Sequence, residues 1–429
     1  MKRTVIRRNA IPDEILNNTS LNEAISRLPS NYNFEIHKTI HRITQAHAKT
    51  VCLQFPEGLA VYACAIADII RHFTHARVIV MGDVTYGACC VDDYSAKRLG
   101  ADFMVHYGHS CLIPIQKTQI PILYVFVELH INVDHLVKTI HANVPEDQRI
   151  ALLGTIQFSQ AIHQAAAQLQ SFYPEVLIPQ QKPLSRGEVL GCTSPIMPTT
   201  DCMIFLADGR FHIESAMIMN PSVCTLRYNP YTMELTEEEY DLNKMRSIRG
   251  NEIEKAKKAV HWGIVLGTLG RQGNEMILER LKTILKKKNL VYDVVLLSEI
   301  SDATLSRMKG IDCWVQIACP RLSIDWGSGY SRPLLTCYEA FVALGEAEWT
   351  EQYPMDWYSA EGGPWSNCQN FFVCHKHNQL LYQRKKLIHS RDIMEIFGGS
   401  FGIAAKELDW HIICHRDDVI KTAKITSTE

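Results

Sequence analysis

Three cysteines in this sequence lie in turns or at strand ends, and cysteine thiolates are the protein ligands that hold iron–sulfur clusters. Cys89 ends the stretch GDVTYGAC, Cys192 lies in LGCTSP, and Cys319 lies in QIACPR. Small residues or proline flank each thiol, which lets the backbone approach a bulky ligand. Because three thiolates on a four-iron cluster leave one iron open for a substrate, the pattern is compatible with a catalytic cluster.

The same cysteines have a second interpretation as small buried apolar side chains, which is the usual role of a free cysteine. The sequence contains 14 cysteines but no C-x-x-C pair, so any metal site must combine distant segments. Cys90 would point elsewhere than its neighbour Cys89 and is the weaker candidate. The other ten, Cys202 among them, fall mostly within apolar strand or helix patterns and are expected to be packing residues. Spacing alone leaves both interpretations open.

A run of spaced glycines follows a predicted strand and opens a predicted helix. Gly267, Gly270 and Gly273 form the pattern G-x-x-G-x-x-G, whose backbone N–H groups could take a carboxylate or a phosphate. The pattern is not G-x-G-x-x-G, and no acidic residue is placed to bind a ribose, so it gives little support to a dinucleotide site. A tight strand-to-helix turn explains the glycines equally well.

Histidines and arginines lie at two further strand ends, HYGHS (106–110) and DGRFH (208–212). Their imidazoles could bind substrate or donate protons, although a histidine in such a place is more often a hydrogen-bonded structural residue. Arg210 and Arg321 could hold a carboxylate through two hydrogen bonds each, or form salt bridges within the protein.

The composition excludes several classes of protein. The sequence has 44 basic and 46 acidic residues and a net charge of -2, which argues against a broad nucleic-acid-binding surface. No apolar run approaches the roughly 20 residues of a membrane-spanning helix, so no membrane association is expected. The basic N-terminus is not followed by an apolar signal segment, which favours a reducing, cytoplasmic location.

Short apolar strands alternate with helical patterns along most of the chain. Similar strands open near residues 50, 149 and 261, and a helical pattern follows each of them. This order predicts an α/β fold of three duplicated domains, each a small parallel sheet flanked by helices. Ligands of such sheets bind beyond the carboxyl ends of the strands, where the three cysteines lie. The expected boundaries are an N-terminal extension (1–48), domain 1 (49–146), domain 2 (147–233), a charged, solvated linker helix (234–258), domain 3 (259–374) and a tail (375–429).

Several motifs, taken together and in order, resemble the family that carries out the first step of diphthamide synthesis. They are GDVTYGACCVDD, HYGHSCLIP, LGCTSP, ADGRFH, GTLGRQG and QIACPRLSIDWG. The N-terminal segment from residue 11 and the later YPMDWYSAEGGPWS resemble eukaryotic members, and not the shorter archaeal homodimeric ones. The resemblance covers about residues 10 to 370 and implies three homologous domains arranged around a central iron–sulfur site.

The resemblance also implies the chemistry. Cys89, Cys192 and Cys319 would each hold one iron of a 4Fe–4S cluster, and S-adenosylmethionine would bind the open iron. Cleavage of a carbon–sulfur bond would release a 3-amino-3-carboxypropyl radical, which adds to C2 of a histidine imidazole in elongation factor 2 while methylthioadenosine leaves. No side chain is assigned as a general base. The residues expected to shape the ligand site are Gly209, Arg210, His212, Gly267, Gly270 and Gly273.

The same resemblance implies a heterodimer with a paralogous subunit and a small redox protein as electron donor. Two other hypotheses remain at this stage. The chain could be a non-catalytic or electron-relay subunit of that complex, although all three cysteines are in their motifs. It could also be a cluster-bearing dehydratase of the quinolinate synthase type, which needs no S-adenosylmethionine.

Overall fold

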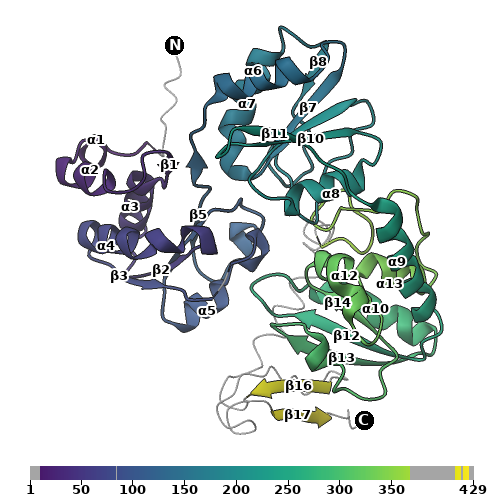
Figure 1. The fold of residues 1–429 in the computed structure, drawn as a ribbon. Helices are drawn as coiled ribbons and strands as arrows, with labels where there is room; N and C mark the ends of the chain where they lie inside the picture. Colours follow the sequence, from purple (N-terminus) through teal and green to yellow (C-terminus); the bar gives the residue numbers. More distant parts are fainter. Residues whose placement is uncertain (1–9, 84, 368–410, 417–418, 425–429) are drawn as a thin grey trace, which may run out of the picture.

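The structure, a computed structural model, describes residues 10–83, 85–367, 411–416 and 419–424 and contains three α/β units (Figure 1). The first unit has the sheet order β3-β2-β4-β5, the second β11-β10-β9-β7-β8, and the third β13-β12-β14-β15. Their strands are β2 (Thr50–Gln54), β3 (Arg77–Val80), β4 (Phe103–Tyr107), β5 (Ile122–Val125), β7 (Arg149–Gly154), β8 (Glu175–Leu177), β9 (Cys202–Leu206), β10 (Cys224–Asn229), β11 (Glu234–Glu237), β12 (His261–Gly267), β13 (Val291–Leu297), β14 (Cys313–Ile317) and β15 (Leu334–Leu335).

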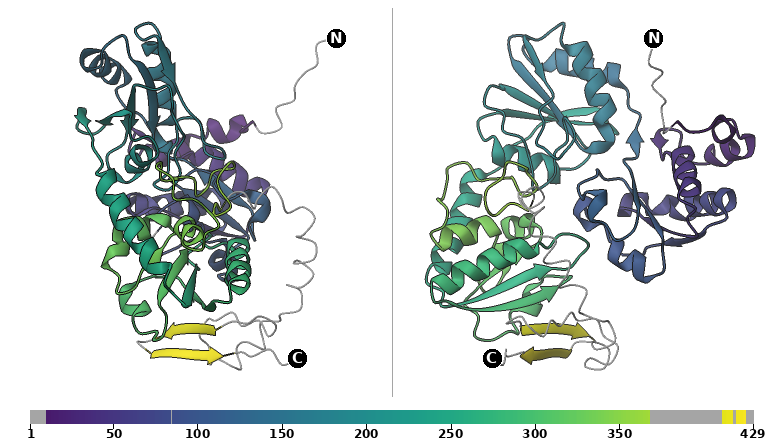
Figure 2. Two further views of the ribbon diagram at one scale, coloured as in Figure 1. Left: turned by 90° about the vertical axis from the view of Figure 1, so that its right-hand side faces the viewer. Right: turned by 180° about the vertical axis from the view of Figure 1, so that it is seen from behind.

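Helices flank the three sheets, and an N-terminal group of helices packs beside the first unit (Figures 1 and 2). The N-terminal group and first unit contain α1 (Asp13–Leu16), α2 (Thr19–Ile25), α3 (Ile36–Gln45), α4 (Ala63–Thr74) and α5 (Asp93–Arg98). The second unit contains α6 (Val133–Asn143), α7 (Ser159–Leu169) and α8 (Phe211–Met219). The third unit is flanked by α9 (Leu242–Ala256), α10 (Glu275–Lys287), α11 (Asp302–Leu305), α12 (Pro320–Trp326) and α13 (Cys337–Ala343).

Two short pairings complete the described strands. Strand β1 (Tyr32–Asn33) pairs antiparallel with β6 (Glu128–Leu129), which ties the N-terminal segment to the end of the first unit. Strands β16 (His411–Arg416) and β17 (Val419–Lys424) form an antiparallel pair beside β13, as both views in Figure 2 show. Apart from these strands, the predicted tail lies outside the described residues, as do Cys368 and Cys374.

The three sheets share one strand order. In each unit the first strand lies between the second and the third, the fourth extends the sheet beyond the third, and these four strands run parallel. This common order is what a duplicated α/β unit predicts, because parallel neighbours need helical crossovers of one hand. The period seen in the sequence therefore corresponds to a repeated topology.

An aspartate occupies the same place in each unit. Asp102, Asp201 and Asp312 directly precede the third strand, and each accepts hydrogen bonds of 2.9–3.1 Å from backbone N–H groups where the first strand begins. These N–H groups begin a strand and would otherwise lack a partner in the sheet. The repeated tie is a second structural sign that the three units are related.

The segment between the second and third units differs from the expected solvated helix over 234–258. Its start is β11, which pairs antiparallel with β10 and adds an edge to the second sheet. Helix α9 begins only at Leu242 and buries one face, including Arg249, whose guanidinium donates to the Glu339 carboxylate at 2.7 and 2.5 Å. The charged composition suggested solvent exposure, but part of that charge forms a buried ion pair with α13.

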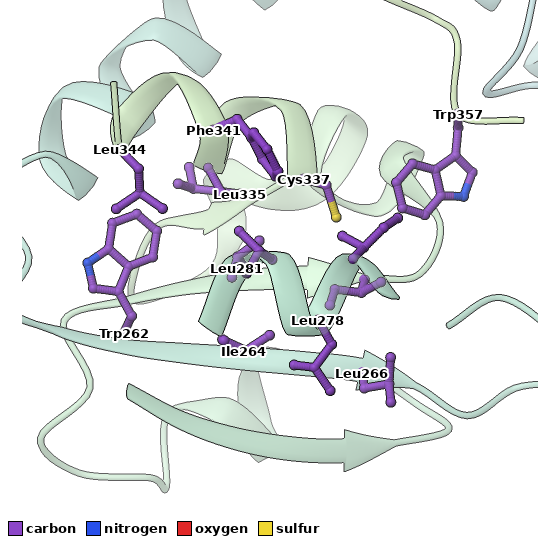
Figure 3. Packing of buried hydrophobic residues seen from close by; sticks show 14 of the residues in the cluster. Trp262, Ile264, Leu266, Leu278, Leu281, Leu335, Cys337, Phe341, Leu344 and Trp357 are labelled. Carbon is purple, nitrogen blue, oxygen red and sulfur yellow. The ribbon is translucent and has the colours of Figure 1, made fainter. Parts of the chain in front are cut away.

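The core of the third unit lies between α10 and α13 and extends toward the other two units. Leu278 and Leu281 on α10 pack over Ile264 on β12, and Trp357 closes one end of the cluster (Figure 3). Asn274 caps α10 by accepting a hydrogen bond of 2.8 Å from the N–H of Met276. The same apolar cluster includes Ala88 from the first unit and Cys192 from the second. The three units are therefore in contact around the ends of their strands.

Candidate metal centre

Each predicted cysteine is placed by the loop at the end of a strand or beside one. Cys89 lies in a single 3-10 turn, Ala88–Cys90, after β3. Cys192 lies in the loop between β8 and β9, and Cys319 is the N-cap of α12 directly after β14. All three are free thiols; Cys192 is 9% exposed, whereas Cys89 and Cys319 are half-buried. We refer to these three thiols as the thiol site.

The three thiols interact electrostatically with one another. A hydrogen bond with Cys90 and burial are the main causes that hold the pKa of Cys89 well above its usual value, and charges on Cys319 and Cys192 raise it further. Burial, followed by the charge on Cys319, raises the pKa of Cys192. The packing agrees with this interaction, because Cys192 belongs to the apolar cluster of the third unit and Cys89 packs against the same cluster.

The chemistry of the thiol site suits a cluster better than a single ion. Among the described residues, no group of three or more His, Cys, Asp or Glu side chains is arranged to hold a metal ion. A cluster of several iron and sulfide atoms spans more space and takes thiolates as ligands. Ionising three facing thiols is unfavourable unless a cation compensates the charge, and iron supplies that charge. The donor set therefore fits an iron–sulfur cluster.

Arg321 places a positive charge beside the thiol site. Its positive charge lowers the pKa of Cys192 and of Cys319, which partly opposes the effect of burial. The guanidinium is itself held by Glu214 and by Asp325, whose two oxygens accept hydrogen bonds of 2.9 and 3.0 Å. The carboxylates that Arg321 binds here thus belong to the protein, and Arg321 contributes charge to the thiol site.

The glycines at 267, 270 and 273 allow close contact between segments of the chain itself. A Cβ on Gly270 would lie 2.5–2.7 Å from backbone atoms of Cys90, and Gly270 has a φ of +54° that favours glycine. The next residue, Arg271, donates its backbone N–H to the carbonyl oxygen of Cys89 at 2.8 Å. Cβ atoms on Gly267 and Gly273 would meet Ala318 and the Gly267 carbonyl oxygen, at 2.7 and 2.3 Å. The turn therefore brings the third unit against the loop that carries Cys89.

The other three residues expected to shape the ligand site, Gly209, Arg210 and His212, differ from one another in exposure and in their contacts. A Cβ on Gly209 would meet nothing within 4 Å. Arg210 is partly exposed and binds the Glu238 carboxylate and the Glu239 carbonyl oxygen. His212 is half-buried, and its enclosed Nδ1 has no hydrogen-bond partner among the described residues. Burial is the main cause that lowers its pKa to about 4, so the ring is neutral at pH 7.

His212 lies close enough to His109 to influence the pKa of the His109 ring. Burial first, and then the charge of His212, lowers the pKa of His109 to about 4. His106 lies beneath it, with ring centroids 5.3 Å apart, and its Nδ1 is 2.9 Å from the Gln54 Oε1. The two histidine-bearing strand ends predicted from the sequence thus lie near each other, and the half-buried rings of His109 and His212 are neutral at pH 7.

Two residues beside the thiol site were not identified from the sequence. Gln272 donates its Nε2 to the sulfurs of Cys89 at 3.6 Å and Cys90 at 3.5 Å. Tyr358 is 1% exposed, and the charges of all three thiols raise the pKa of its hydroxyl after the larger effect of burial. Both belong to quoted motifs, but only the folded chain brings them to the cysteines.

The loop of Cys192 is joined to the segment that carries Tyr358. The N–H of Tyr358 donates to the Thr193 hydroxyl at 2.9 Å, and the N–H of Trp357 donates to the Cys192 carbonyl oxygen at 3.2 Å. The segment around Trp357 runs between the second and third units (Figure 2). This pairing explains why YPMDWYSAEGGPWS accompanies the cysteine motifs.

The remaining cysteines whose side chains the structure describes divide, apart from Cys90, into two groups. Cys52, Cys202, Cys313 and Cys337 are buried, as expected for packing residues. Cys64, Cys111 and Cys224 are exposed, so the expectation of packing was wrong for them.

No helix among the described residues combines the length and apolar character that crossing a bilayer requires.

Comparison with known proteins shows the family of this chain. Residues 55–354 match the family model described as "Putative diphthamide synthesis protein". The chain is 53% identical over 366 residues to 2-(3-amino-3-carboxypropyl)histidine synthase subunit 1 of Dictyostelium discoideum, covering 83% of this chain and 78% of the relative. It is 52% identical over 362 residues to the protein of that name in Homo sapiens, covering 83% and 82%.

A solved structure shares the fold. Dph2 from Pyrococcus horikoshii superimposes with a TM-score of 0.64 at 24% identity, covering 75% of this chain and 94% of that chain. A second structure of that protein, with the same measures of similarity, contains a 4Fe-4S cluster. The matched family model and the relatives together lead to one conclusion: this chain belongs to the diphthamide synthesis family.

Proposed function

We propose that this chain transfers the 3-amino-3-carboxypropyl group of S-adenosylmethionine to C2 of a histidine imidazole in elongation factor 2, the first step of diphthamide synthesis. The observation that supports this most directly is the thiol site, where cysteines from three units interact. The names of the relatives and the cluster in the archaeal structure agree with it.

In this proposal Cys89, Cys192 and Cys319 hold a 4Fe–4S cluster, which supplies, when bound and reduced, the single electron that cleaves the sulfonium. One carbon–sulfur bond breaks, methylthioadenosine leaves, and a carbon–carbon bond forms to imidazole C2. The adduct radical then loses the C2 proton and gives back one electron, which would replace the electron that the reduced cluster supplied for cleavage, so the transfer has no net redox change.

The side chains of this chain contribute position and shielding. The apolar cluster around Cys192 keeps water from one side of the thiol site, which protects a radical. Arg321 provides positive charge beside Cys192 and Cys319. The neutral rings of His109 and His212 can hold a hydrogen bond without adding charge. None of these groups is required to remove a proton from the substrate before the carbon–sulfur bond breaks.

We further propose that the chain works in the cytoplasm as a heterodimer with a paralogous subunit, and that a small redox protein supplies its electrons. The substrate is a folded protein, which is compatible with a chain whose net charge is -2. Nucleic acid and membrane have no part in the proposed reaction.

The test is anaerobic reconstitution of the full chain with iron and sulfide, together with its partner subunit and elongation factor 2. With dithionite and S-adenosylmethionine, we expect methylthioadenosine and a mass increase on one histidine of elongation factor 2. A bound cluster that leaves S-adenosylmethionine intact under these conditions would contradict the catalytic role and favour the supporting one. Failure to bind S-adenosylmethionine would favour the dehydratase.

A further inference from the structure

Tyr358 presents an unusual hydroxyl to the thiol site. The side chain is fully enclosed, and its hydroxyl has no oxygen or nitrogen partner among the described residues; only the Cys89 thiol acts on it as a weak hydrogen-bond partner. A buried hydroxyl without a partner costs about 1–3 kcal/mol, so such a group usually has a role. Its electrostatic neighbours are the three thiols, and its backbone is fixed by Thr193 next to Cys192. The hydroxyl therefore lies beside the Cys89 thiol, next to the Cys192 loop.

Gln272 presents a second donor from a different element. Its carboxamide bonds to the Cys89 and Cys90 sulfurs, and the side chain is 9% exposed. The backbone of this residue is held in place, because the Asn367 Nδ2 donates a hydrogen bond of 3.2 Å to the backbone carbonyl oxygen of Gln272. The adjoining Gly270 and Arg271 are packed against and bonded to the Cys89–Cys90 backbone. Gln272 is thus held where its N–H groups meet a ligand sulfur.

We propose that Tyr358 and Gln272 are positioning residues that donate hydrogen bonds to the sulfur atoms around a bound cluster and raise its reduction potential. Hydrogen bonds to sulfur are among the factors that set cluster potentials, because they disperse the negative charge added by reduction. The effect is larger in an enclosed site, where water does not screen it. This inference rests on the proposed function, since it requires a cluster on the thiol site.

The hydroxyl and the carboxamide come from two separate segments, one joined to the Cys192 loop and one in the glycine turn. Their contributions should therefore be separable by mutation. Tyr358→Phe removes only an oxygen atom, and Gln272→Leu removes only the polar amide at similar volume. Neither residue supplies a thiolate ligand.

The experiment uses the reconstituted full chain with its partner subunit and a redox titration followed by electron paramagnetic resonance. We expect Tyr358→Phe and Gln272→Leu to retain iron and sulfide but to shift the midpoint potential to more negative values, with a larger shift in the double variant. The matched control is Tyr107→Phe, which removes another buried hydroxyl without a partner, in β4 of the first unit. Its midpoint should equal that of the wild type.

The outcomes are distinguishable. If the wild type binds no cluster, both the proposed function and this inference are overturned. If the wild type binds a cluster and both variants keep its potential, the inference alone is overturned. If both variants lose the cluster while Tyr107→Phe keeps it, the residues are structural and the tuning role is wrong. A second readout, the g-values of the reduced cluster, should change in the variants that shift the potential.

Discussion

The backbone N–H of Arg271 donates a hydrogen bond of 2.8 Å to the carbonyl oxygen of Cys89. This bond joins the glycine turn of the third unit to the thiol loop of the first. Gly270 makes the approach possible, because a Cβ at that position would overlap the Cys90 backbone. The position of one thiol thus depends on the absence of a side chain in another unit.

Gly270→Ala should weaken the thiol site through this contact. The added methyl group meets backbone, and alanine is strained at a φ of +54°, so we expect a loss of about 1–3 kcal/mol of stability and reduced iron binding. Iron per chain after reconstitution and urea unfolding measure the two effects. Gly209→Ala is the matched control, since its Cβ meets nothing within 4 Å. Equal iron content in both variants would contradict the role given to Gly270.

Replacing any one of Cys89, Cys192 and Cys319 by alanine should abolish the brown colour and the activity. The reason is that the remaining two thiolates leave a second iron without a protein ligand. Cys202→Ala, on β9, removes a buried thiol away from the site and should cost only about 1–2 kcal/mol of packing. Full iron content in all four variants would show that the ligand assignment is wrong.

Breaking the buried ion pair should destabilise the third unit. Arg249→Met leaves the Glu339 carboxylate enclosed and without its cation, for a loss of about 3–5 kcal/mol in urea unfolding. The double variant with Glu339→Gln should recover part of that loss, because no charge remains buried. Lys257→Met, which removes an exposed pair with Glu254, is the control and should change stability by less than about 1 kcal/mol.

The free energy of unfolding should decrease as the pH is lowered from about 6.5 to about 4. His109 and His212 are neutral in the fold because burial lowers each pKa to about 4, from a usual value near 6.5. In that window the unfolded chain binds more protons than the folded chain, so acid favours unfolding, by about 1–3 kcal/mol for each ring.

The double variant His109→Gln/His212→Gln isolates this effect in unfolding measured between pH 4 and 7. It should flatten the dependence of unfolding free energy on pH in that window, whereas His72→Gln, at an exposed position of α4, should leave the slope unchanged. A slope that persists in the double variant would assign the acid sensitivity to other groups.

Much of the fold was predictable because buried parallel strands have a simple signature. The opening strands at 50, 149 and 261 begin where expected, since continuous apolar runs between helical patterns seldom have another explanation. The edge strand β11 was missed because its residues, ELTE, are polar and its pairing with β10 depends on the tertiary fold.

The candidate site was only partly predictable, for a related reason. Cysteine is chemically distinctive, so Cys89, Cys192 and Cys319 could be selected by residue type and context. Gln272 and Tyr358 are common residue types, and their relevance comes from side chains brought together across more than 160 positions. The glycine run was noticed, but sequence alone could not distinguish contact with a ligand from contact with Cys90.

The repeated aspartate ties have a consequence for assembly. Asp102, Asp201 and Asp312 each fasten a sheet using partners from the same unit only. Each sheet therefore has the ties that fix its strand order without help from another unit. We expect metal loading to be the event that locks three already folded pieces together, so that the metal-free protein opens between its lobes before any lobe melts.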